Sequence, residues 1–225
     1  MSKASQTKLL ARWLREIGVD FAPRSFLRDE IAQEKLSEEA ETLDGIRREL
    51  VDCKGCVLCE KRNKVVFGTG DPRAQLMFVG EAPGAEEDLQ GEPFVGAAGK
   101  RLNHWIESIG MARQDVYIAN IVKCRPPGNN VPTPEQARLC MPYLIRQIRV
   151  INPRFICTLG ATALNYMFGA EERITKARGL WREWNGIPLL PTYHPAFILR
   201  DPSREKEVLK DFKDLANRLS LLKTE

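Results

Sequence analysis

The stretch AQLMFVGEAPG, residues 74–84, decides the fold, because a nearly unbroken apolar run ends there in a glycine- and proline-containing turn. A short apolar run of this kind predicts a buried strand. Three more such runs follow, and helical patterns separate them. The later predicted strands are DVYIANIV (115–122), RFICTLG (154–160) and IPLLPTY (187–193). The predicted helices span residues 99–109, 134–151, 161–168 and 203–222.

Strands that alternate with helices predict an α/β fold, because parallel strands need crossover connections. We expect three layers, α/β/α, around a central and mostly parallel sheet of four strands. Helical patterns at 6–18 and 27–52 precede this unit and are rich in charged side chains. The sequence therefore predicts a charged helical extension over 1–50 and a globular α/β domain over 51–225. The extension is interpreted as a packing arm, and a partner-binding helix is the alternative.

The composition is that of a globular protein of 225 residues with a net charge of +4, a weak indication of a polyanionic partner. No apolar run approaches the ~20 residues that a membrane helix needs. The basic N-terminus has no continuous apolar segment of the kind found in secretory signals. We expect a cytoplasmic monomer with no membrane partner.

Six cysteines in such a protein are more typical of metal ligands or buried thiols than of disulfides. Cys53, Cys56 and Cys59 follow one another at intervals of three in DCKGCVLCEK. A CxxC pair needs two more ligands to complete a set of four thiolates. Spacing alone permits zinc or a 4Fe–4S cluster, and it leaves Cys59 in competition with Cys140. Cys157, inside a predicted strand, is interpreted as a core residue.

Polar residues follow three of the predicted strands, and ligands bind at the carboxyl ends of strands in open α/β sheets. The GEAPG turn (80–84) follows the first strand, Asn120 lies at the second, and His194 follows the fourth. The turn lacks the spacing of both common phosphate-binding fingerprints. Phe94, in a loop, is either a core residue or, beside an Asn amide and a His, a ring that stacks on a planar ligand. An Asn amide suits the edge of an amide-like heterocycle. Together these groups predict a pocket for a base.

Three long segments carry a resemblance to a known family. They are GEAPGAEEDLQGEPFVGAAGKRLN (80–103), YIANIVKCRPPGNNVPTP (117–134) and PTYHPAFILRDPS (191–203). In this order they resemble the family 4 uracil-DNA glycosylases, the iron–sulfur members of that superfamily. The resemblance covers roughly two-thirds of the chain, from Cys53 to Pro202. It implies flipping of uracil from DNA and hydrolysis of its N-glycosidic bond, with free uracil and an abasic site as products.

The resemblance also implies roles for single residues. Gly80 through Gly84, including Ala82, would form the first catalytic motif, and Glu81 would exclude a 5-methyl group. Phe94 would stack on the flipped uracil, and Asn120 would read its edge. His194 would stabilise negative charge on the uracil O2. Ala82 stands where the best-known family has a water-activating aspartate, so we expect Glu87 to position the water.

Further implied roles concern DNA and the cluster. The segment after His194 resembles a loop that enters the minor groove, with Leu199 as a wedge. Contacts to the DNA are then expected from the following set: Pro195, Leu199, Arg200 and Arg178, with Lys176 and Arg182 as weaker candidates. The family pattern assigns a structural 4Fe–4S cluster to Cys53, Cys56, Cys124 and Cys140, which leaves Cys59 as a packing thiol.

The sequence also permits other interpretations of the function. A related protein traps uracil-DNA covalently through a histidine in an inserted loop, but residues 121–139 contain no histidine. We therefore expect turnover on single- or double-stranded DNA, with no lyase activity. The alternatives are a non-catalytic metal-cluster module that binds DNA, a uracil-DNA binder with weak turnover, and a nucleotide-binding α/β protein.

Overall fold

The structure, a computed structural model, describes residues 41–221. The predicted helix at 6–18, and the part of the 27–52 helix before residue 41, lie outside the described residues. The sheet has six strands in the order β1-β3-β2-β4-β6-β5. Their bounds are β1 Thr69–Gly70, β2 Leu76–Gly80, β3 Tyr117–Asn120, β4 Phe155–Leu159, β5 Arg182–Trp184 and β6 Ile187–Thr192.

The four predicted strands form the parallel centre of this sheet, as expected. The prediction of four strands in all was incomplete, because β1 and β5 are added antiparallel at the two edges. They have only two and three residues, too few to give an apolar pattern. The sheet is therefore mixed, with a parallel core that places four carboxyl ends along one rim.

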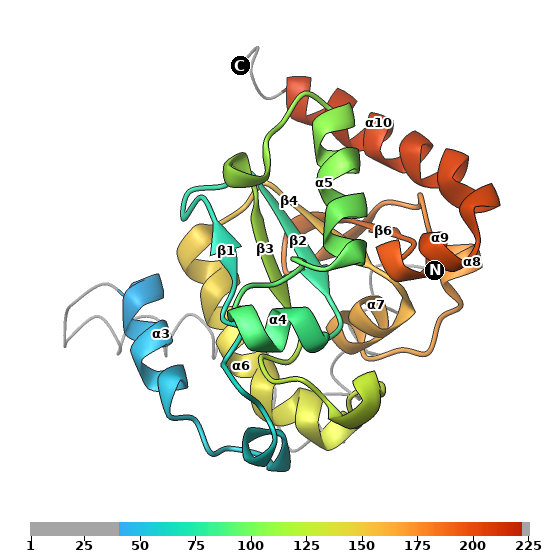
Figure 1. Ribbon diagram of the computed structural model, residues 1–225. Helices are drawn as coiled ribbons and strands as arrows, with labels where there is room; N and C mark the ends of the chain where they lie inside the picture. The colour runs from blue at the N-terminus through green and yellow to red at the C-terminus, as the bar shows by residue number, and fades with distance from the viewer. Residues whose placement is uncertain (1–40, 222–225) are drawn as a thin grey trace.

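Helices cover both faces of the sheet, so the expected three layers are confirmed (Figure 1). Helices α6 and α7 contribute to the apolar cluster on one face, and α5, α9 and α10 contribute to the cluster on the other. The helix bounds are α3 Leu43–Val51, α4 Ala85–Gln90, α5 Ala97–Ser108, α6 Pro134–Ile151, α7 Ala161–Phe168, α8 Ile174–Ala177, α9 Pro195–Arg200 and α10 Glu205–Leu221. Short 3-10 turns lie at Val57–Glu60, Arg113–Asp115, Pro127–Asn129 and Pro202–Arg204.

Local sequence explains where the longest helix begins and ends. Thr133 accepts a hydrogen bond from the backbone N–H of Gln136 at 3.2 Å, and the Gln136 side chain accepts one from the Thr133 N–H at 3.0 Å. This reciprocal cap, with Pro134 at the first helical position, starts α6 at the predicted residue. Asn152 ends it in the left-handed conformation.

Helix α3 belongs to the packed unit, although it lies largely before residue 51. Ile46 and Leu50 are buried in a small cluster with Phe67. On the surface, the Arg146 guanidinium of α6 pairs with the Glu49 carboxylate at 2.6 Å. The boundary drawn after residue 50 therefore falls inside α3. In the described part of the chain, no helix has the length and apolar character to span a membrane.

Candidate active site

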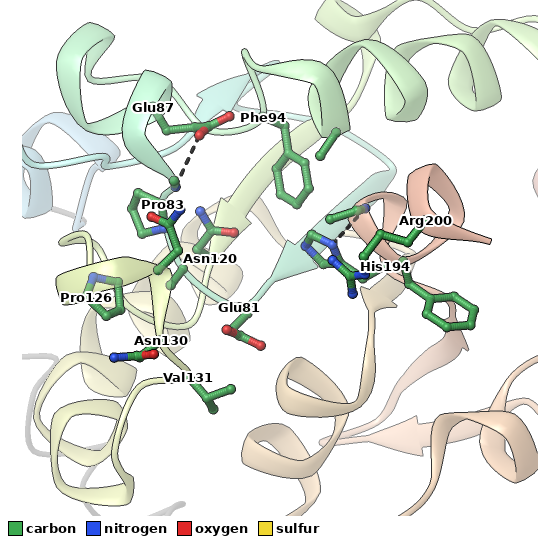
Figure 2. A pocket seen from close by; sticks show the side chains of 16 residues that line it. Glu81, Pro83, Glu87, Phe94, Asn120, Pro126, Asn130, Val131, His194 and Arg200 are labelled. Atoms are coloured by element: carbon green, nitrogen blue, oxygen red, sulfur yellow. Dashed lines mark hydrogen bonds between the residues drawn. The ribbon is translucent and has the colours of Figure 1, made fainter. Parts of the chain in front are cut away.

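One pocket of about 470 Å³ opens at the carboxyl ends of β2, β3 and β6. Side chains from loops after all three strands surround it (Figure 2). The lining includes Glu81, Ala82, Phe94, Asn120, His194 and Arg200. The convergence expected from the sequence is therefore seen in the structure, because parallel strands bring their carboxyl ends to one rim.

Asn120 is the buried polar group of this pocket. It lies at the end of β3 beside Gly80 of β2, and only 1% of it is exposed. Its Oδ1 is buried and has no hydrogen-bond partner within residues 41–221. Native proteins rarely leave a buried acceptor unpaired, since this costs about 1–3 kcal/mol. Such an acceptor beside a pocket is suited to a donor on a ligand.

His194 caps the N-terminus of α9 and keeps its imidazole neutral. Its Nδ1 accepts a hydrogen bond from the Ala196 backbone N–H at 3.1 Å. Nδ1 is thus the unprotonated nitrogen, so Nε2 carries the proton and can donate. Burial, and after it the nearby charge of Arg200, lower the pKa of His194 to about 4. The side chain is therefore a neutral donor at pH 7.

Phe94 holds an unusual backbone conformation beside these two groups. Its φ is +52°, in the left-handed region that bulky side chains rarely adopt, at a cost of about 1–3 kcal/mol. The residue is 6% exposed, and the centroid of its ring lies 5.6 Å from that of the His194 ring. Strain of this kind persists only where neighbouring groups hold it. The ring is therefore fixed at the wall of the pocket.

Two carboxylates near the pocket differ in how they are engaged. Glu81 lines the cavity. The pKa of Tyr166 on α7 is raised mainly by burial of the phenol and also by the nearby charge of Glu81. Glu87 lies in α4, and its two oxygens accept three backbone N–H bonds from the loops on either side. The prediction that Glu87 positions water needs a free carboxylate oxygen. These three bonds favour a structural role for Glu87.

Comparisons with known proteins agree with this geometry. The model of the uracil DNA glycosylase superfamily matches residues 67–218, more than half of the chain. Curated type-4 uracil-DNA glycosylases are similar over most of their length. The Archaeoglobus fulgidus protein is 43% identical over 78% of this chain and 92% of its own. The Sulfurisphaera tokodaii protein is 45% identical over 78% and 84%, and the Thermotoga maritima protein 44% over 77% and 92%.

The chain belongs to the type-4 uracil-DNA glycosylase family. The resemblance inferred from the three sequence segments is thereby confirmed. The matched relatives are named for one activity, and the described pocket lies within the matched residues 67–218.

Substitution of Gly80 tests how tightly the side chains of this type-4 glycosylase pack around the pocket. A Cβ at this position would lie 2.4 Å from Asn120 Oδ1 and 2.6 Å from the Phe94 ring. We expect Gly80→Ala to slow uracil release by about 10²-fold, since a shift near 1 Å misplaces the pocket groups. Single-turnover kinetics on a uracil oligonucleotide measure this. Gly45→Ala in α3 is the control, because its Cβ meets only Thr42 Oγ1 at 3.4 Å; equal losses in both variants would refute the explanation.

The three residues of α9 that were predicted to contact DNA differ in their exposure. Leu199 is 41% exposed, and Arg200 is exposed at the pocket rim. Both are free to meet DNA, as the assignment requires. Pro195 is instead buried at the first turn of α9, where its fixed φ helps to start the helix. The predicted contact of the Pro195 side chain with DNA is therefore corrected to a local structural role.

Arg178 is a second correction, because its charge is used inside the protein. Its guanidinium donates to the Asp211 carboxylate from Nε at 2.9 Å and also from Nη2. The same group reaches the Glu207 backbone carbonyl at 2.7 Å, and its side chain is only 15% exposed. Arg182 is likewise paired with Glu172 at 2.5 Å. Neither arginine is placed as a contact to the DNA backbone; Lys176 is exposed.

The four cysteines that were predicted as cluster ligands lie near one another. Cys124 is buried in one apolar cluster, with Cys56 and Cys140 packed against it. Burial raises the pKa of Cys124, and the nearby charges of Cys56 and Cys53 raise it further. Burial likewise raises the pKa of Cys140 to about 11. Within residues 41–221, no three thiol, imidazole or carboxylate groups are already placed to hold one metal ion. The four thiols are therefore neighbours rather than a finished coordination shell.

Hydrogen-bond donors surround these sulfurs. The Lys123 N–H donates to Cys140 Sγ at 3.3 Å, and the Gly55 N–H donates to Cys53 Sγ at 3.4 Å. The Arg62 guanidinium donates to Cys124 Sγ at 3.4 Å. Such donors stabilise thiolates, and they are among the factors that tune thiolate-bound iron centres.

Two residues of this site were missed by the sequence interpretation. Lys123 is fully buried, and its Nζ donates to the Asn120 carbonyl at 2.9 Å and to Gln147 Oε1 at 2.6 Å. Burial lowers its pKa to about 8. A lysine inside the apolar run around IVKC was a readable signal of a paired buried charge. Arg113, which bonds the Phe94 loop, lies in a polar turn and carries no such signal.

Proposed function

We propose that this protein is a monofunctional uracil-DNA glycosylase. It hydrolyses the N-glycosidic bond of uracil in DNA, releases free uracil and leaves an abasic site in an intact strand. One observation carries the proposal: the neutral Nε2–H donor of His194 and the unpartnered buried amide oxygen of Asn120 lie around one pocket. Membership of the type-4 family supports it.

Recognition begins with a flipped nucleotide, since uracil cannot be reached inside a duplex. The pocket then offers the ring of Phe94 for stacking on the base. The Asn120 amide has an acceptor and donors, which match the N3–H and O4 of uracil. Glu81 stands at the wall and is proposed to exclude a 5-methyl group, and hence thymine.

Bond cleavage requires stabilisation of the departing uracil. The C1′–N1 bond breaks, and its electron pair is delocalised over the ring, mainly onto the oxygens. His194 donates from Nε2 to O2, where this charge develops; one fixed donor of this kind contributes about 10²- to 10³-fold in rate. Water adds its hydroxyl to C1′, and its proton goes to the uracil anion.

The DNA side of the reaction is assigned to α9. Leu199 projects from it as an exposed apolar side chain, suited to fill the gap that a flipped base leaves. Arg200 is an exposed cation at the same rim, suited to a phosphate. We propose that these two residues hold the duplex or single strand while the base occupies the pocket.

We further propose that a structural 4Fe–4S cluster is held by Cys53, Cys56, Cys124 and Cys140. Four neighbouring thiols with hydrogen-bond donors at three sulfurs fit this group by donor chemistry. When bound, the cluster ties the start of the domain to the segment after Asn120, and with every iron held by thiolate it supplies no site for water. Cys59 is left outside the set.

The function is tested with one uracil-containing oligonucleotide. We expect alkali to cleave the strand after incubation with the protein, and we expect no cleavage of a thymine control. Breaks should disappear in Asn120→Ala, and no heat-stable protein–DNA band should form on a denaturing gel. A non-catalytic DNA-binding module would shift the oligonucleotide and leave it intact. Uncut strands across pH and salt would therefore refute the proposal.

A further inference from the structure

Two charged side chains hold the Phe94 loop from opposite ends. Before and at Phe94, the Arg113 guanidinium donates to the Pro93 carbonyl and, at 3.1 Å, to the Phe94 carbonyl. After Phe94, one oxygen of Glu87 accepts the N–H groups of Val95 and Gly96, each at 2.9 Å. The carbonyls before the bend and the amides after it are thus fixed by groups of opposite charge.

Each clamp is itself anchored. Arg113 also donates to Asn103 Oδ1 at 3.0 Å, which ties the loop to α5. The second oxygen of Glu87 accepts the Gly84 N–H at 3.1 Å, which ties the loop to the GEAPG turn. The Phe94 loop is therefore joined to both neighbouring parts of the pocket wall, and Figure 2 shows the bond between Glu87 and the GEAPG turn.

We propose that Glu87 and Arg113 are positioning residues, which hold Phe94 in its left-handed conformation so that its ring meets the flipped uracil. This inference rests on the proposed function. Phe94 at a φ of +52° has an extended alternative that is more favourable for a bulky residue. Loss of either clamp removes bonds that exist only in the bent form. The loop then relaxes, and the ring leaves the wall.

Close packing supports the same conclusion. A Cβ on Gly99 would lie 1.8 Å from the Phe94 carbonyl oxygen, so the first turn of α5 contacts the loop backbone directly. The loop is thus packed by α5 on the side where Arg113 binds. A site that is held by packing and by charge together is pre-organised, and small displacements in such sites slow reactions strongly.

A competing role for Glu87 is that of a base or orienting group for water. That role acts on the nucleophile and does not depend on Phe94. A positioning role acts through the ring, so its effect vanishes once the ring is absent. The two roles are separated by a double-mutant cycle with Phe94→Ala.

The experiment measures single-turnover uracil release and the affinity for an abasic-site oligonucleotide. We expect Arg113→Met and Glu87→Ala each to slow release by about 10- to 100-fold, with the affinity changed less than threefold. In the Phe94→Ala background, each should add less than threefold. Arg113→Lys keeps the positive charge but has a single donor nitrogen, so it should retain an intermediate rate. The matched controls, Glu107→Gln and Arg154→Met, change exposed charges and should match wild type.

A second readout does not depend on activity. In protein labelled with fluorophenylalanine, the resonance lost in Phe94→Leu identifies Phe94. It should move or broaden in the clamp variants and stay unchanged in the controls. An unmoved resonance, or losses that remain fully additive with Phe94→Ala, would overturn the inference. Wild-type protein that released no uracil but showed the expected shifts would refute the proposed function and leave the clamp standing.

Discussion

Replacing His194 with alanine should slow uracil release by about 10²- to 10³-fold, a loss of roughly 2.7–4 kcal/mol of transition-state stabilisation. The reason is geometric, because Nε2 is the nitrogen left free to donate once Nδ1 accepts the Ala196 N–H. Water that enters the space left by the imidazole is not held in one orientation, so it does not replace a donor that a helix cap fixes. Single-turnover kinetics on single-stranded uracil DNA measure the effect.

The control for this prediction is the other histidine of the chain. His104 is exposed on α5, so His104→Ala removes an imidazole without touching the pocket. We expect wild-type rates from it. DNA affinity should change little in His194→Ala, since the donor acts on the charge that forms as the bond breaks. A variant that lost affinity and rate together would point to a collapsed loop instead.

The pH profile gives the same prediction a second readout. Because the pKa of His194 is lowered to about 4, the imidazole stays neutral through the range where an ordinary histidine titrates. The rate of release should therefore show no step near pH 6.5 that depends on His194, and should fall only toward pH 4. The folded protein binds this proton less readily than the unfolded chain, so stability declines as pH falls from about 6.5 to about 4. A His194-dependent step near 6.5 would contradict the neutral donor.

Replacing Cys56 with serine should abolish the proposed cluster and destabilise the protein. Metal binding of this kind contributes directly to folding, and a loss of about 5 kcal/mol lowers the melting temperature by roughly 10–20 °C. The physical reason is that Cys56 packs against the apolar cluster that contains buried Cys124, so the loss of one ligand opens a site built between two chain segments. Absorbance near roughly 400 nm, iron content and thermal unfolding measure the outcome.

Cys59 supplies the matched control, because it lies three residues away in the same loop. Its charge raises the pKa of Arg62, but it is not among the main causes of the raised pKa values of Cys124 and Cys140. Cys59→Ser should keep the colour, the iron and the melting temperature within a few degrees. Loss of iron in Cys59→Ser with retention in Cys56→Ser would reverse the ligand assignment.

The central sheet and the pocket were predictable because their signals are local. The apolar run of β2 and the cap of α6 are written in consecutive residues, so both elements fall where the sequence places them. Asn120 and His194 follow strands, and strand ends in a parallel sheet meet. The topology therefore brings together Asn120 and His194, which lie 74 positions apart in the sequence.

The parts that could not be predicted depend on partners without a sequence pattern. Arg113 binds backbone carbonyls 19 and 20 residues earlier, and every residue offers a carbonyl. Arg178 was assigned to DNA because basic turns often bind phosphate. Its guanidinium instead pairs with the carboxylate of Asp211, which lies 33 residues later in α10. Glu87 was assigned to the water because the resemblance leaves Ala82 in place of a water-activating aspartate, although three amides occupy the oxygens of Glu87.

Helix α9 has a consequence for how damage is found. It is six residues long, with His194 at its cap and Leu199 near its end. Under the proposed function, this one short element sets the spacing between the leucine in the DNA and the imidazole at the base. The side chain that fills the gap in the duplex and the side chain that stabilises the leaving uracil are therefore placed together.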